Sequence, residues 1–312
     1  MMSGGHAASG ALTGTLLVSA LDVLDLAPIT SASYLWAAVL LGAAGALWPD
    51  IDCDGSTAYR SVPAVTPVLG ELLQWLSRTL YRLTAREHDP PPYQRHRDFA
   101  RLSRRAKLLV LLGIASMDDS GDGPDKRGEH RGLTHWWGAA VLLGAAISWL
   151  VAVVPAAALV VTAVMLPSGI RALGWALADL INAIVRPLGV RKVYGPKPGV
   201  ALLAGLVVTG VCWEDILALG PWLGVIVAVG MITHDAGDSI THYGVPWKAL
   251  IPHRCDRCRA RTPKPQRKCA MWDRNTLLPE QLTFTTGSRA ELALTAGWLA
   301  STAGMILAML AR

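Results

Sequence analysis

The sequence predicts an all-α fold: a polytopic transmembrane helical bundle of about 6–7 spans, with cytoplasmic loops and a small Cys-rich insertion. Of the 312 residues, 52% are hydrophobic and only 17% are charged, whereas a soluble domain carries about 25% charged residues. The apolar stretches are dominated by Ala, Leu, Val and Gly, and small residues of this kind let helices pack closely in lipid. Composition therefore favours a membrane protein over a soluble core.

Seven stretches approach the roughly 20 apolar residues that cross a bilayer. They are Ala7–Ala27, Ser33–Trp48, Trp136–Val153, Ala156–Ile184, Pro198–Trp213, Ile216–Thr233 and Ala290–Leu310. The second and fifth stretches are short. The fourth is interrupted by Pro167 to Gly169 and by Arg171, so we expect Gly169 to Arg186 to be an interfacial helix.

Positive charge is concentrated in three polar segments. Segments 50–135, 186–197 and 248–289 hold 13, 4 and 10 of the 29 Lys and Arg residues. With seven spans these segments share one side with the N-terminus, and the positive-inside rule makes that side cytoplasmic. We expect a multi-pass protein of the inner (cytoplasmic) membrane whose basic loops contact anionic lipid head groups. No specific nucleic-acid partner is expected, and the oligomeric state stays open.

This topology divides the chain into five segments. They are an N-terminal transmembrane hairpin (1–48), a cytoplasmic segment (49–135), a transmembrane core (136–247), a basic Cys-rich insertion (248–289) and a C-terminal transmembrane helix (290–312). In the second segment, leucines recur at helical spacing over Pro63 to Leu83 between Glu71, Arg78 and Arg82. This pattern predicts an amphipathic helix on the membrane surface.

Four polar motifs fall at the ends of predicted spans, all on the same membrane face. Candidate metal ligands in these motifs are His6, Asp50, His135, His234 and Asp238. Charged and imidazole groups are costly at lipid depth and usually face a functional interior. Taken singly, each has a plainer explanation, such as helix capping by Asp50 or an interfacial histidine at position 135, but the cluster favours metal binding.

His234 and Asp238 are four residues apart, so they share one helix face if the sixth span continues through them. The alternative for this pair is an ion pair at the helix end. Imidazole with carboxylate suits zinc, with manganese or iron as alternatives. Asp50 and Asp52 follow Pro49 and are separated by one residue. In an extended turn their side chains would point in different directions, so we expect only one of them to bind the metal directly.

A divalent metal would activate water and neutralise a developing oxyanion. Arg131 is then placed to bind an anionic group such as a phosphate, because a guanidinium grips phosphate oxygens in a fork. Candidates for a catalytic base, or for residues that support the ligands, are Asp52, His130 and Asp235.

The Cys-rich insertion carries a second candidate metal site. His253, Cys255, Cys258 and Cys269 resemble the ligands of a structural zinc knuckle. His253 is only two residues from Cys255, which is too close for both to bind one zinc ion with good geometry, so the fourth ligand stays open. The alternatives are a loop of reduced cysteines without metal, and redox use.

In this order, the motifs resemble the YdjM-type inner-membrane metal-dependent hydrolases. The matching elements are Gly4–His6, Pro49–Asp52, His130–His135, His234–Asp238 and a closing Thr286–Ser288 with Glu291. The family is grouped distantly with zinc-dependent phospholipase C and related nucleases, so the resemblance implies phosphoester hydrolysis by clustered metals. The chain departs from the family in its enlarged first cytoplasmic segment and its basic insertion after Pro252.

The leading hypothesis is a membrane-bound metal-dependent hydrolase that acts on a phosphoester, with a membrane lipid as one candidate substrate. The alternative is a structural or regulatory membrane protein that needs its metal for stability and has no turnover. A transporter would show ionisable residues inside several spans and repeated halves, and the sequence shows no internal repeat.

Overall fold

The computed structural model describes residues 3–26, 31–53, 56–85, 133–189, 191–241, 244–246, 276–279 and 282–311. Every regular element in these ranges is a helix, and the β pairing found within them is an isolated bridge between Thr241 and Phe284. The predicted all-α class is confirmed for this part of the chain. The four candidate ligands of the Cys-rich insertion lie outside it.

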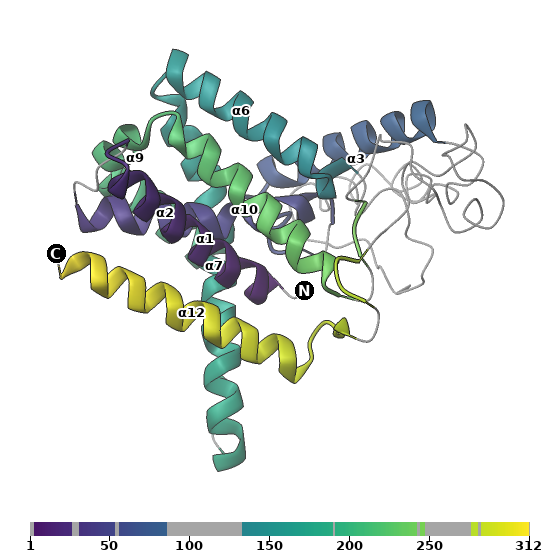
Figure 1. Ribbon diagram of the computed structural model, residues 1–312, viewed down its shortest axis with the longest axis vertical. Helices are drawn as coiled ribbons and strands as arrows, with labels where there is room; N and C mark the ends of the chain where they lie inside the picture. The colour runs from purple at the N-terminus through teal and green to yellow at the C-terminus, as the bar shows by residue number, and fades with distance from the viewer. Residues whose placement is uncertain are drawn as a thin grey trace.

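Three helices form the centre: α1 (Ser3–Val23), α2 (Ala32–Gly45) and α10 (Trp222–Ser239). Glycines lie where their backbones meet. A Cβ on Gly14 would lie 2.9 Å from the Ala38 carbonyl oxygen, and one on Gly230 would lie 2.7 Å from the Gly42 carbonyl oxygen. Packing through small residues therefore brings the start of α1 and the ends of α2 and α10 together (Figure 1).

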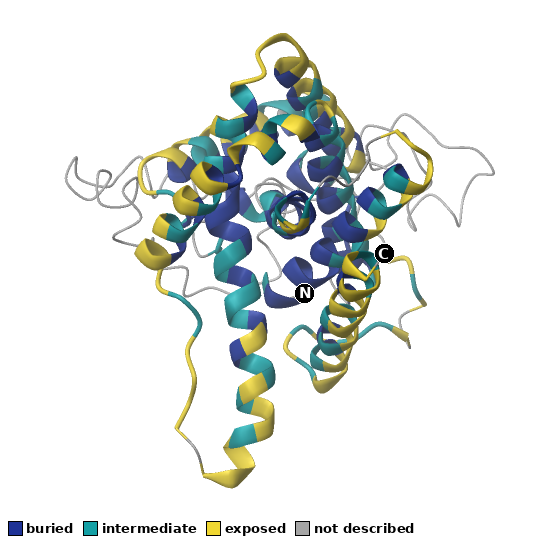
Figure 2. Cartoon of the chain, turned by 90° about the vertical axis from the view of Figure 1, so that its left-hand side faces the viewer, coloured by how far each residue is buried: buried dark blue, intermediate teal, exposed yellow. Residues whose placement is uncertain are grey.

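Helix α6 (Trp137–Val153) packs on α10, and α7 (Ala157–Val185) crosses α2. Figure 2 shows that the first half of α7 is mostly buried and that its second half projects past the other helices. The expected interruption of α7 at Pro167 to Gly169 is wrong, because the helix runs through these residues unbroken. Gly169 lies against α2, where a Cβ would be 2.8 Å from the Leu40 carbonyl oxygen.

The predicted sixth span is divided in the structure. Helices α8 (Pro198–Val211) and α9 (Trp213–Leu219) bend by 77° at Cys212, and α10 then begins at Trp222. Gly220 adopts a φ of +52° between α9 and α10, a conformation that favours glycine. Ile216 and Thr233 consequently belong to different helices.

Two described helices are long and apolar enough to cross a membrane: α7 with its 3₁₀ extension η3 (Arg186–Leu188), and α12 (Arg289–Leu310). The bent α8–α9 pair makes up to three. This is fewer than the 6–7 predicted spans, because α2 and α6 have only 14 and 17 residues and the last turns of α10 are polar. Figure 1 shows α12 crossing α7 steeply.

Helix α3 (Val65–Thr84) confirms the helix expected over Pro63 to Leu83. Its apolar face is exposed at Leu72, Trp75 and Leu76, and its polar face is buried at Gln74, Ser77 and Arg78. The polar face contacts two short 3₁₀ helices, η1 (Trp48–Asp52) and η2 (Leu133–His135). Gln74 Nε2 donates to the Asp52 carbonyl oxygen, and Ser77 Oγ accepts from the Leu133 amide at 3.1 Å.

Candidate metal centre

Five candidate ligands from separate parts of the chain converge at one point. The set comprises His6 in the first turn of α1, Asp50 in η1, His135 in η2, and His234 and Asp238 in the last turns of α10. Figure 1 shows the N-terminus beside the end of α10. All are buried except Asp50, whose side chain is 19% exposed. The only solvent-accessible ligand therefore comes from η1.

Helix α10 continues to Ser239, so His234 and Asp238 share a helix face as the spacing predicted. His234 Nε2 lies 3.8 Å from Asp238 Oδ2 and 3.6 Å from Asp50 Oδ1. The imidazole thus lies between two carboxylates. A helix-end ion pair of His234 and Asp238 alone would not include Asp50.

The separations between ligand atoms suit a single ion. His135 Nε2 lies 3.1 Å from His234 Nε2 and 3.5 Å from Asp50 Oδ1. A tetrahedral zinc ion with bonds of about 2.0–2.2 Å holds its ligand atoms about 3.4 Å apart. The two imidazoles and the Asp50 carboxylate are spaced close to that value.

Asp238 links these ligands to the third histidine. Its Oδ1 lies 3.2 Å from His6 Nε2, and its Oδ2 lies 3.7 Å from His135 Nε2. The His6 and His234 rings are stacked with centroids 3.7 Å apart. Two overlapping groups could hold a metal ion: His6, Asp50 and His234, or His135, His234 and Asp238. Both include His234, whose Nε2 lone pair can bind one ion at a time.

Hydrogen bonds at the far ring nitrogens fix how the imidazoles face the centre. His234 Nδ1 lies 2.7 Å from the Ala46 carbonyl oxygen, so this nitrogen carries the proton. His135 Nδ1 lies 3.2 Å from Thr134 Oγ1, and that hydroxyl donates to Asp52 Oδ2 at 2.7 Å. A histidine that binds a metal commonly donates its other N–H to a carbonyl or carboxylate in this way.

This tautomer leaves a lone pair on each Nε2, and the two lone pairs are 3.1 Å apart. Two acceptors at that distance repel one another unless a cation lies between them. The carboxylates of Asp50 and Asp238 add negative charge at the same place. The arrangement is therefore suited to binding a cation.

The remaining sequence candidates have different positions. Asp52 is fully buried and faces Thr134, so Asp50 and Asp52 do diverge. Asp235 is fully buried beside His234 on α10. His130 and Arg131 lie outside the described residues.

Two contributors escaped the sequence reasoning. Thr134 lies within a motif that the sequence singled out, and a hydroxyl next to a candidate ligand was a usable signal. The Ala46 carbonyl is available to His234 because α2 ends at Gly45. No residue type in the sequence signals a free backbone carbonyl at this position.

A family model described as YdjM inner membrane protein matches residues 1–311. The chain belongs to the YdjM inner membrane protein family. Membership over the whole length confirms the resemblance seen in the ordered motifs, and with the apolar helices it identifies a membrane protein. Searches of curated proteins and of solved structures found no match.

Proposed function

We propose that this YdjM family member is a membrane-bound metal-dependent hydrolase that acts on a phosphoester. The observation that carries the proposal is the pair of Nε2 lone pairs on His135 and His234, 3.1 Å apart and flanked by two carboxylates. Such a site would hold zinc, with manganese or iron as alternatives. The bound ion would supply an acidic water and a positive charge beside the reacting oxygen.

Access to the centre is from the side of Asp50. Its side chain is 19% exposed, whereas those of His135 and His234 are fully buried. A substrate group would therefore approach past Asp50, and because the two imidazoles are screened from water, an ion held by them would act more strongly on the approaching group.

Residues around the centre would divide the remaining tasks. Asp52 acts through Thr134 to keep the His135 lone pair aimed at the centre. Asp235, next to His234, is a candidate base. His130 and Arg131 precede η2 in the chain, separated from it by Gly132, and in this proposal Arg131 binds a phosphate oxygen. The basic loops support a cytoplasmic position for this face of the membrane, by the positive-inside rule.

One observation favours a second function. Four of the five ligands are buried, and closed metal sites are typical of structural roles. In that case the metal would stabilise a non-catalytic membrane protein, and its removal would unfold the protein.

The test is to purify the full chain in detergent, load it with zinc or manganese, and measure metal content, melting temperature and hydrolysis of a chromogenic phosphodiester. His135→Asn removes a ligand, and Asp25→Asn, in the exposed turn after α1, is the control.

Hydrolysis should require the metal, and His135→Asn should lose both metal and turnover while Asp25→Asn keeps both. Hydrolysis that continues at full rate in metal-free protein would refute the proposal. If the metal only raises the melting temperature and no phosphoester is cleaved, the structural function replaces it.

A further inference from the structure

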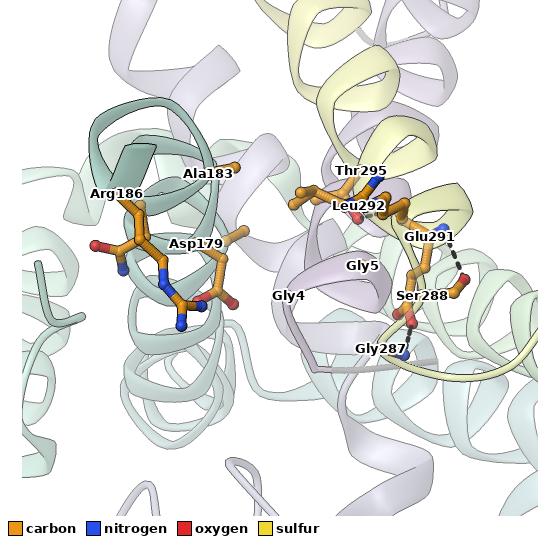
Figure 3. Close-up of a pocket in the computed structure, with 13 residues that line it drawn as sticks. Gly4, Gly5, Asp179, Ala183, Arg186, Gly287, Ser288, Glu291, Leu292 and Thr295 are labelled. Carbon is orange, nitrogen blue, oxygen red and sulfur yellow. Dashed lines mark hydrogen bonds between the residues drawn. The ribbon is translucent and has the colours of Figure 1, made fainter. Parts of the chain in front are cut away.

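A pocket of about 360 Å³ that is lined by apolar and polar residues lies between the second half of α7, the start of α12 and the first turn of α1. Figure 3 shows side chains of α7 facing those of α12, with the backbone of α1 between them. The labelled polar side chains come from α7 and its extension η3, with Asp179 and Arg186, and from the start of α12, with its N-cap Ser288, Glu291 and Thr295. None of them belongs to the candidate metal centre.

The helix arrangement explains why a space remains there. Helix α1 packs on both α7 and α12, whereas α7 and α12 make few contacts with each other. Gly4 lets α1 lie tightly on α7, because a Cβ there would be 3.2 Å from Ala176. Gly4 and Gly5 therefore form one wall of the pocket, and the next residue is the candidate ligand His6.

Charges in the pocket are ordered from inside to outside. Glu291 is buried and caps α12, where its Oε2 accepts from the Gly287 amide at 2.7 Å. Asp179 is half-buried, and both Arg186 and Arg289 are exposed. Asp179 and Arg186 form no ion pair within the described part of the chain. The interior is negative and the rim is positive.

A ligand that matches this order carries an ammonium at its tip and a phosphate behind it. We propose that the pocket binds the headgroup of an amine-containing phospholipid, with the ammonium at Asp179 and the phosphate at Arg186 and Arg289. Guanidinium groups bind phosphate oxygens in a bidentate manner. A pocket of about 360 Å³ falls within the range of roughly 300–1,000 Å³ that is usual for small ligands.

The opposite face of the same half of α7 indicates a lipid rather than a free solute. Leu177, Ile181 and Ile184 are 52%, 43% and 70% exposed there. At 100° per residue this apolar stripe lies opposite the stripe that carries Asp179 and Arg186. In this proposal α7 crosses the bilayer, as its length and composition allow, with the apolar stripe against acyl chains and with Asp179 and Arg186 near the headgroup level at its end.

The segment after α7 supports the same placement. Val193 lies against α7, where its amide and carbonyl bond to the Asn182 side chain, each at 2.8 Å. Tyr194 is 70% exposed, and Lys192 Nζ lies 5.5 Å from the centre of its ring. Exposed aromatic and basic residues are enriched where proteins meet the headgroup region.

Binding can be tested without turnover, so this proposal stands apart from the hydrolase. The detergent-purified chain is titrated by calorimetry with dihexanoyl phosphatidylethanolamine, dihexanoyl phosphatidylglycerol and free phosphoethanolamine. The variants are Asp179→Asn and Arg186→Gln, with Arg191→Gln as an exposed control outside the pocket lining. Asp179→Glu keeps the charge, and melting temperature checks that each variant is folded.

We expect the wild-type chain to bind the amine lipid about tenfold more tightly than the glycerol lipid, as a charge-assisted contact predicts. Asp179→Asn should abolish that preference and Asp179→Glu should keep it. Arg186→Gln should weaken both lipids about tenfold, and Arg191→Gln should change neither.

Two results would overturn the inference. One is an undiminished amine preference in Asp179→Asn. The other is free phosphoethanolamine binding as tightly as the lipid, which would assign the pocket to a soluble ligand.

Discussion

Thr134→Val tests whether the hydrogen bonds behind His135 set up the metal centre. Valine has nearly the shape of threonine, so the change removes the hydroxyl and leaves the volume. Thr134 is 4% exposed, and its Oγ1 contacts both Asp52 Oδ2 at 2.7 Å and His135 Nδ1 at 3.2 Å. The substitution therefore removes a donor from a buried carboxylate and the acceptor that holds the imidazole tautomer.

Both effects have an expected size. Loss of a hydrogen bond to a charged group costs about 1.5–3 kcal/mol of stability, and Asp52 has no exposed surface through which water could replace it. Loss of a residue that orients a metal ligand lowers metal affinity by about 10–100-fold, equivalent to about 1.4–2.8 kcal/mol.

The assay is a competition titration of zinc against a chromogenic chelator, with melting temperature measured in parallel. Thr209→Val is the matched control, because the Thr209 hydroxyl donates to the Gly205 carbonyl oxygen of its own helix at 2.8 Å. Zinc affinity should fall in Thr134→Val and stay unchanged in Thr209→Val. Wild-type affinity in a destabilised Thr134→Val protein would show that the link from Asp52 through Thr134 does not orient His135.

Two further predictions concern packing and the insertion. In Gly42→Ala the new methyl group would collide with the Gly10 carbonyl oxygen, so we expect a loss of about 1–3 kcal/mol of stability and weaker metal binding; Gly297→Ala, where nothing lies within 4 Å, should leave both unchanged. Equal metal affinity in Gly42→Ala and wild type would show that the helix packing at Gly42 does not position the ligands of the metal centre. Changing Cys255 and Cys258 together to Ser should remove one zinc equivalent in elemental analysis, while the His/Asp centre keeps its metal. An unchanged zinc content would show that these cysteines do not form a zinc knuckle.

The candidate site was more predictable from the sequence than the span count. Each of the five ligand candidates lies in a short motif at a helix end, and the spacing of His234 and Asp238 has one helical interpretation. Hydropathy predicts a span at α2, but the helix has only 14 residues, and ten of them are buried against the rest of the protein. Hydropathy also misplaced the break near Gly220, because apolar residues continue on both sides of it.

Helix α7 shows why residue types alone misled. Proline and glycine at Pro167 and Gly169 ordinarily end or weaken a helix. Here Gly169 serves close packing against the Leu40 carbonyl, and the helix continues. The local preference was overridden by a contact with α2, which is far away in the sequence.

The orientation of α3 couples the metal centre to its surroundings. Its polar face holds η1 and η2 together through Gln74 and Ser77, and its apolar face, with Leu72 and Trp75, is left outside. Wherever that outer face enters lipid, removing it from water contributes about 25 cal/mol for each Å². By thermodynamic linkage the same free energy would favour the arrangement in which Asp50 and His135 lie 3.5 Å apart. If the proposed centre binds a metal, metal binding and membrane binding would strengthen each other, and the lipid chosen for purification would change the metal occupancy that is measured.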